Sequence, residues 1–222
     1  MREKDQLRCF YENAWFSLEE AELERFLPSL GMNDECLEQM PRELWQFCGK
    51  GLRFWQYPNQ LAGLICLLRQ REARSYLEIG SRWGGTCEIL DSLLRAGCPE
   101  LRSYAVDVIE EPPLLQQYRQ GRAVTYVQGS SADVETWLRL PEQIDVVFID
   151  GDHSWEGVKR DFNMAMKLCP QTVIFHDTAS DACPDVRRYW SHLREIFADT
   201  HEFHEQYESV RGSFLGIGVV LL

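Results

Sequence analysis

The chain has 222 residues, of which 45% are hydrophobic and 26% charged, and its formal net charge is −12. This length allows one α/β domain with a sizeable core and a modest extension, and the composition is ordinary for a soluble globular protein. The acidic balance argues against a broad surface for nucleic-acid phosphates, so we expect a small-molecule partner and no nucleic acid. No apolar stretch approaches the roughly 18 residues that a membrane span needs, and we expect no membrane partner.

The chain has eight cysteines and no C-x-x-C pair. Several of them fall on apolar faces, which favours reduced core cysteines over a disulfide framework. The N-terminal stretch MREKDQLRCFYEN has no apolar core of signal-peptide length. We therefore expect a cytoplasmic protein.

Residues 1–54 do not show the pattern of a sheet. Ser17–Glu20 (SLEE) has the form of a capping box and predicts a helix that ends near Pro28. A second helix is expected from Asn33 to about Phe47. We interpret the segment as an N-terminal helical extension, either a cap on the core or a substrate lid or dimer arm, which would make a homo-oligomer.

An extended stretch and a helix from Asn59 to about Gln70 follow, and Trp55 in this stretch either borders a ligand site or packs as a staple. The next segment, Ser75–Thr86, reads SYLEIGSRWGGT. An apolar strand, a glycine turn and a helix start form the first unit of a nucleotide-binding α/β sheet, because glycines let the backbone approach a ligand. A dinucleotide fingerprint would need glycine where this chain has Arg82.

The glycine turn instead resembles motif I, E-x-G-x-x-x-G, of the class I S-adenosylmethionine (SAM) methyltransferases. The resemblance implies that this turn contacts the cofactor. The residues expected to do so are Glu78, Gly80, Ser81, Gly84 and Gly85.

Strands and helices then alternate to the end of the chain. The expected strands are 101–108, 123–127, 144–149 and 172–175, and the expected helices are 112–120, a short one ending near 138, 154–168 and 184–197. Two extended runs without a helix between them, 201–208 and 214–222, predict a closing hairpin. The fold class is therefore α/β, a Rossmann-like seven-stranded methyltransferase sheet of five parallel β–α units plus a terminal antiparallel hairpin, over residues 55–222.

Polar residues follow the carboxyl ends of these strands, where a doubly wound sheet binds its ligands. Asp107 lies 22 residues after Gly85, near the spacing of about 20 for an acid that grips ribose hydroxyls, although it could instead cap the next helix. Ser130 and Ser131 are expected near the adenine, with a helix N-cap as the alternative for Ser131.

Two further strings, FIDGDHSWEGVKRD (148–161) and VIFHDT (173–178), carry a closer resemblance. With the glycine turn, they are similar to O-methyltransferases related to catechol O-methyltransferase, in the branch with cephalosporin-hydroxylase-like and macrolide-sugar methyltransferases. The resemblance implies a divalent metal, usually magnesium, on Asp150, which also borders the cofactor, and on His176 and Asp177. His176 departs from the usual oxygen ligand and leaves three interpretations: a softer metal, a histidine beside the metal, or no metal.

The same resemblance assigns the base to the third residue after the first metal ligand, which is His153. Asp152 is an alternative that we expect to cap the following helix instead. A neutral histidine can take a hydroxyl proton near pH 7, and a metal lowers the pKa of that hydroxyl.

The sequence thus predicts a SAM-dependent methyltransferase acting on a hydroxyl of a small molecule or sugar, in small-molecule biosynthesis, with assistance from a divalent metal. Three alternatives stay open: an N-methyltransferase, a nicotinamide-dependent Rossmann oxidoreductase and a non-catalytic SAM-binding protein. Arg82 in the glycine turn and the terminal hairpin count against the oxidoreductase.

Overall fold

A computed structural model describes residues 14–118 and 124–222. Its seven strands form one sheet in the order β3-β2-β1-β4-β5-β7-β6. Strands β1 to β5 run parallel, whereas β7 lies between β5 and β6 and is antiparallel to both. The strands are β1 (Ser75–Ile79), β2 (Arg102–Asp107), β3 (Val124–Gln128), β4 (Val146–Ile149), β5 (Thr172–His176), β6 (Thr200–Phe203) and β7 (Ile217–Leu221). The predicted fold class is confirmed.

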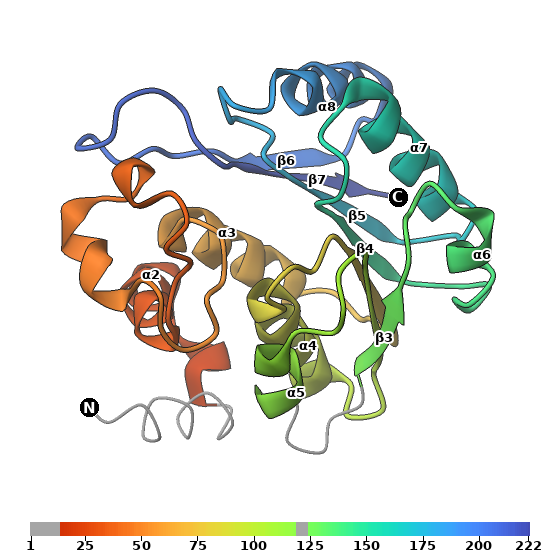
Figure 1. Ribbon diagram of the computed structural model, residues 1–222, viewed down its shortest axis with the longest axis horizontal. Helices are drawn as coiled ribbons and strands as arrows, with labels where there is room; N and C mark the ends of the chain where they lie inside the picture. Colours follow the sequence, from red (N-terminus) through yellow and green to blue (C-terminus); the bar gives the residue numbers. More distant parts are fainter. Residues whose placement is uncertain (1–13, 119–123) are drawn as a thin grey trace.

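Helices cover both faces of this sheet (Figure 1). On one side lie α3 (Pro58–Leu68), α4 (Gly85–Gly97) and α5 (Pro113–Tyr118). On the other lie α6 (Val134–Trp137), α7 (Trp155–Met166) and α8 (Pro184–Ile196). The predicted C-terminal end of α5 and the predicted first residue of β3 fall in 119–123, outside the described residues.

The central strands are apolar because both of their faces are covered. Every residue of β1, β4, β5 and β7 is buried, as expected for strands between two helical layers. The side chains of these strands divide between two hydrophobic clusters, one toward α3 and α4 and the other toward α7 and α8. The carboxyl ends of the parallel strands are thereby held at one edge of a rigid sheet.

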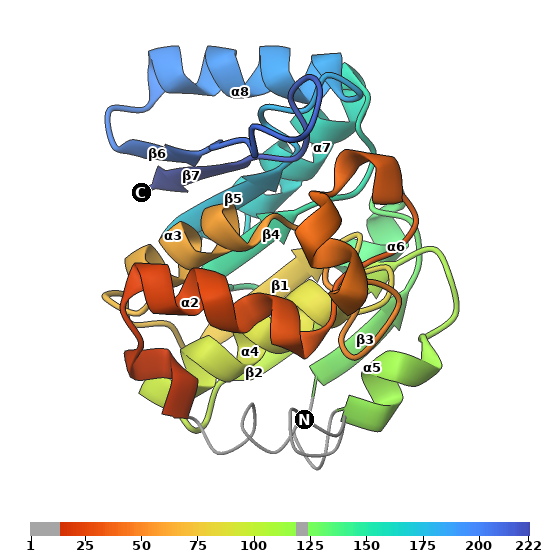
Figure 2. The same ribbon diagram turned by 90° about the vertical axis from the view of Figure 1, so that its left-hand side faces the viewer.

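The N-terminal segment packs on the α3 side and differs from the prediction (Figure 2). It contains η1 (Ala14–Ser17), α2 (Glu20–Phe26), η2 (Leu27–Leu30), η3 (Leu37–Gln39) and η4 (Arg42–Phe47). The capping box of α2 uses Glu19 and Glu22 rather than Ser17. The single helix predicted from Asn33 to Phe47 is wrong, because Met40 and Pro41 are extended and separate two short 3-10 helices.

The terminal hairpin is shorter than predicted. Strands β6 and β7 pair in register from Thr200 with Val220 to Phe203 with Ile217, and the chain between them has no regular structure apart from turns. No helix among the described residues is long and apolar enough to cross a bilayer.

Candidate active site

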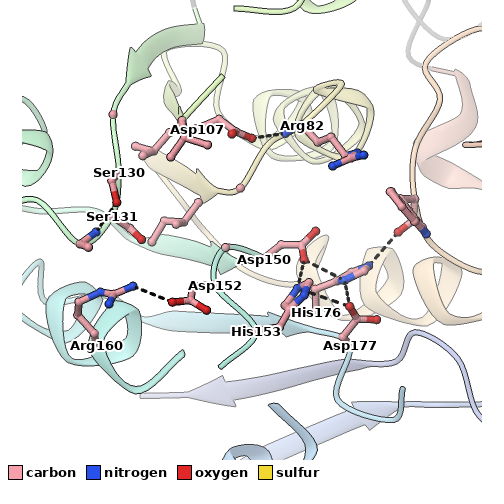
Figure 3. Close-up of a pocket in the computed structure, with 18 residues that line it drawn as sticks. Arg82, Asp107, Ser130, Ser131, Asp150, Asp152, His153, Arg160, His176 and Asp177 are labelled. Atoms are coloured by element: carbon pink, nitrogen blue, oxygen red, sulfur yellow. Dashed lines mark hydrogen bonds and ion pairs between the residues drawn. The ribbon is translucent and has the colours of Figure 1, made fainter. Parts of the chain in front are cut away.

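A cavity of about 560 Å³ lies at the carboxyl ends of the parallel strands. Strand β1 is hydrogen-bonded to β2 on one side and to β4 on the other, so the chain order reverses here. This switch point is where open α/β sheets bind ligands. Figure 3 shows Asp107, Ser130 and Ser131 toward one end of the cavity, and Asp150, His153, His176 and Asp177 toward the other.

The glycine turn after β1 contributes Gly80 to the cavity wall. Gly80 has a φ of +82°, and an added Cβ would lie 1.9 Å from the Asp150 carbonyl oxygen, so no other residue fits without rearrangement. An added Cβ at Gly85 would meet the Leu52 carbonyl oxygen at 2.1 Å. Gly80 is thus constrained by neighbouring backbone at the cavity, and Gly85 by the N-terminal segment packed against α4.

Four of the residues predicted to bind the cofactor lie outside the cavity lining. Glu78 and Ser81 are buried beside the turn, and Gly84 packs against Leu115. The four are Glu78, Ser81, Gly84 and Gly85. Direct contact between these four residues and a cofactor stays a prediction.

Asp107, the last residue of β2, accepts hydrogen bonds from backbone amides on both of its carboxylate oxygens. The Arg82 amide donates to Oδ2 at 2.7 Å, and the Ile109 amide donates to Oδ1 at 3.3 Å. An ionised carboxylate has about four acceptor positions, so two remain for the hydroxyls of a ribose. The orientation of this acid is therefore set before any ligand binds.

The Ser130–Ser131 turn follows β3 and lines the cavity. The N-cap of α6 is Asp133, so the alternative of Ser131 as that cap is wrong. The Ser130 hydroxyl accepts a hydrogen bond from the Ala132 amide at 3.1 Å. The Ser131 side chain lies beside the buried Asp161. Burial raises the pKa of Asp161, and the hydrogen bond from Ser131 offsets part of this increase.

Four titratable side chains meet at the other end of the cavity. Each of Asp150, His153, His176 and Asp177 offers a ligand atom, and these atoms all lie within 4.8 Å of one another. Asp150 Oδ1 is 3.1 Å from His153 Nε2 and 3.0 Å from His176 Nδ1. Asp177 Oδ2 is 3.5 Å and 3.3 Å from the same two atoms. The geometry thus joins the ends of β4 and β5 in one cluster.

His176 indicates that the cluster suits a cation. Its Nε2 lies 2.9 Å from the Trp55 carbonyl oxygen, which only accepts, so Nε2 carries the proton. In the neutral ring, the Nδ1 lone pair then faces the carboxylates of Asp150 and Asp177, and this buried atom has no hydrogen-bond partner. A proton or a metal ion is needed between these acceptors, and histidine ligands commonly donate their second N–H to a carbonyl in this way.

The two carboxylates of this cluster raise the pKa values of both of its histidines. The pKa of His153 is raised to about 10, first by its hydrogen bonds with Asp150 and Cys183 and then by the charges of Asp150 and Asp177, against the effect of burial. Burial opposes the charged form of His176, but the two carboxylates raise its pKa well above the usual value. Without a bound cation, the His153 imidazole is therefore protonated at neutral pH, and the pKa of His176 is shifted in the same direction.

Asp177 adopts a strained conformation within this cluster. Its φ is +61°, which is uncommon for a residue other than glycine. Burial raises the pKa of Asp177, but the positive charges of His176, 3.3 Å away, and of His153 outweigh this effect and lower the pKa to about 2. The Cys183 thiol also donates to Asp177 Oδ2 at 3.2 Å. Strain that persists in a packed site is typical of functional positions.

Asp152 lies beside the cluster and accepts a hydrogen bond from the start of the next helix. Its Oδ1 accepts a hydrogen bond from the Ser154 amide at 3.0 Å, just before α7. Asp152 and Arg160 both line the cavity and lie 3.6 Å apart. The N-cap of α7 is Ser154, whose hydroxyl accepts a hydrogen bond from the Gly157 amide at 3.1 Å. The expectation that Asp152 caps this helix is therefore wrong, because Asp152 lies two residues before the cap.

The cavity lining includes two charged residues that were not predicted as site residues, Arg82 and Arg160, and it also includes Trp55. The Arg82 guanidinium lies 5.2 Å from the centre of the Trp55 ring. The position of Arg82 between Gly80 and Gly84 was a signal for the site, whereas Arg160 lies in mid-helix and has no such signal.

Comparisons with known proteins agree with this architecture. A family model described as a methyltransferase domain matches residues 77–178, which run from the third residue of β1 to two residues past β5. The chain has a methyltransferase fold. A sequence search finds no significant match among curated proteins.

Solved structures with this fold include the O-methyltransferase TomG from Streptomyces achromogenes, involved in tomaymycin synthesis, in complex with SAM. It is 19% identical, with a TM-score of 0.56, covering 92% of this chain and 99% of that chain. An O-methyltransferase from Bacillus cereus in complex with S-adenosylhomocysteine (SAH) is 19% identical, with a TM-score of 0.52, covering 71% and 78%. The MycE methyltransferase of mycinamycin biosynthesis, in complex with Mg and SAH, is 16% identical, with a TM-score of 0.51, covering 78% and 50%.

Proposed function

We propose that this protein is a SAM-dependent O-methyltransferase that acts on a hydroxyl of a small molecule or sugar with the help of a divalent metal. The observation that carries the proposal is the cavity itself, with a ribose-binding geometry at Asp107 and a cation-binding geometry at Asp150, His176 and Asp177. The similar structures that contain SAM or SAH, and in one case Mg, support it.

The cluster fits a divalent cation by the chemistry of its donors. Asp150 and Asp177 would supply carboxylate oxygens, and His176 would supply the Nδ1 lone pair that faces them. Carboxylates suit magnesium and manganese, whereas imidazole suits zinc, iron and other transition metals. When bound, the ion supplies positive charge that offsets the carboxylates and lowers the pKa of a coordinated hydroxyl.

The remaining steps belong to the side chains of this protein. Asp107 holds the ribose, and the turn at Gly80 lets the cofactor approach the backbone. His153, whose side chain is 43% exposed, is placed to accept the hydroxyl proton of the acceptor once its imidazole is neutral. The deprotonated oxygen then attacks the methyl carbon in line from a distance of about 3–3.5 Å, so that the O–C bond forms as the C–S bond of the sulfonium breaks and SAH leaves.

Two measurements test this function. Calorimetry with SAH is expected to show binding, and a screen of hydroxyl acceptors with SAM is expected to show methyl transfer that a chelator abolishes and a divalent cation restores. Binding of NAD in place of SAH would favour the oxidoreductase. SAH binding without turnover on any hydroxyl, but with turnover on amines, would favour N-methylation.

A further inference from the structure

One carboxylate of the N-terminal segment, that of Glu35, accepts hydrogen bonds from two residues of the glycine turn. Glu35 accepts hydrogen bonds from Arg82 Nη2, from Arg82 Nε at 3.3 Å and from Trp83 Nε1 at 3.0 Å. Arg82 and Trp83 are consecutive residues between Gly80 and Gly84. Glu35 is itself outside the cavity lining, so its contacts serve the turn rather than a ligand.

Arg82 has a backbone conformation that must be maintained by its surroundings. Its φ is +43°, in the left-handed region that side chains other than glycine rarely adopt. Such a conformation persists only where several contacts determine it. Here the side chain is held by Glu35, and the backbone amide donates to Asp107 Oδ2 at 2.7 Å.

We propose that Glu35 is a positioning residue for the cofactor: it holds Arg82 in the left-handed conformation that directs the Arg82 amide at Asp107. The carboxylate of Asp107 is thereby fixed in the orientation that receives the ribose hydroxyls. This inference rests on the proposed function, because it assumes that Asp107 binds the ribose of SAM. The segment before α3 thus forms part of the cofactor site although it lies outside the sheet.

The charge state of Glu35 supports this role. Burial raises the pKa of Glu35, but the hydrogen bonds from Arg82 and Trp83 and the charge of Arg82 lower it more, so the pKa lies below its usual value. Glu35 is therefore ionised at neutral pH and makes charge-assisted hydrogen bonds to the guanidinium.

The neighbouring Asp34 offers a matched control. Asp34 also carries a carboxylate and is ion-paired, but with Arg53 at 2.5 Å rather than with Arg82. Its side chain is 41% exposed, against 30% for Glu35. Arg53 itself lies over the Trp83 ring, 4.3 Å from its centre, and is retained in Asp34→Asn. A general effect of removing acidic charge from this segment would appear in both variants, whereas loss of the hydrogen bonds to Arg82 and Trp83 would appear only at Glu35.

The test is a double-mutant cycle read by calorimetry with SAH. We expect Glu35→Gln to weaken SAH binding about tenfold, equivalent to about 1.4 kcal/mol. In an Arg82→Gly background, Glu35→Gln should have no further effect, because glycine adopts positive φ without support. The KM for SAM should rise by the same factor with kcat unchanged, and Asp34→Asn should bind SAH like the wild type.

Two results would overturn the inference: unchanged SAH binding in Glu35→Gln, or the same loss in the Arg82→Gly background as in the wild type. Glu35→Asp in both backgrounds keeps the charge but shortens its reach, and provides the same comparison if Glu35→Gln does not fold. A wild-type protein that fails to bind SAH would instead refute the proposed function.

Discussion

The two ends of the cavity are built in different ways. At the proposed cofactor end, Asp107 accepts hydrogen bonds from the Arg82 and Ile109 amides, and Gly80 lies close to the Asp150 carbonyl. At the proposed cation end, the two carboxylates of Asp150 and Asp177 lie close to the imidazoles of His153 and His176, and their charges are unbalanced unless protons or a metal ion are present. The cofactor end is therefore preorganised by hydrogen bonds, whereas the cation end depends on what it binds.

The largest expected effect is at the cation end. Asp150→Ala removes the oxygen that lies near both His153 and His176, so both metal binding and metal-stimulated turnover should be lost. Calorimetry with manganese or magnesium and a methyl-transfer assay would measure this. Asp181→Asn is the control, because Asp181 is 58% exposed and pairs with Arg187 instead. Metal binding that survives in Asp150→Ala would exclude Asp150 as a ligand.

His153→Ala separates the base from the metal ligands. If His153 takes the hydroxyl proton, kcat should fall by about 10²–10⁴, the usual contribution of one acid–base group. Affinity for SAH and for the metal should be retained, and the residual rate should recover as pH rises because solvent base then ionises the hydroxyl. A variant with near-normal turnover, or one that loses the metal, would assign His153 a different role.

At the cofactor end, the effect should be confined to binding. Asp107→Ala removes a charge-assisted contact with the ribose and should weaken SAH affinity by about 2–3 kcal/mol, or roughly 30- to 150-fold. Asp107→Asn keeps an acceptor for the Arg82 amide and should lose less. Calorimetry decides the matter: SAH affinity within about threefold of the wild type in Asp107→Ala would remove this acid from the site.

Residues of the site differ in how far the sequence could predict their positions. Asp107, Asp150 and His176 stand at or just after the ends of apolar strands, so the alternating pattern alone places them at one sheet edge. The contact between Glu35 and Arg82 joins residues 47 positions apart, and no local pattern reports it. The helix predicted from Asn33 to Phe47 failed for a different reason. Pro41 is a local signal against it, because proline disfavours helical backbone at the residue before it, and Met40 is indeed extended.

Gly80 lies in the cavity lining, but the contact with a ligand that the sequence predicts is not the nearest constraint on it. Its place in the turn predicts close approach to a ligand, but the nearest obstacle to a Cβ is the Asp150 carbonyl oxygen. Gly80→Val would therefore be expected to perturb the backbone that carries Asp150 as well as cofactor binding. Such a variant cannot separate the two ends of the cavity, whereas Asp107→Ala can.

The smallest expected effect concerns stability against pH in protein stripped of divalent cations. The folded pKa of His153 is raised to about 10, above an unfolded value of about 6.5. A raised folded pKa means that the stabilising contribution is complete below about pH 6.5 and is lost as pH rises through about 10. His176, whose pKa is also raised, contributes in the same direction.

Glu78 acts over a lower range and provides the comparison. Burial raises its pKa to about 8, against the hydrogen bond from Tyr76, so its contribution is lost between about pH 4.3 and 8. The melting temperature of the wild type should fall across both ranges. His153→Ala should lessen the fall between pH 8 and 10, and Glu78→Gln the fall below pH 8, each by on the order of a few degrees. A divalent cation should also lessen the fall in melting temperature between pH 8 and 10, because it offsets the charge of the carboxylates that raise the His153 pKa. If neither His153→Ala nor the cation changes the fall in melting temperature between pH 8 and 10, then the charges around His153 do not control stability in the way described.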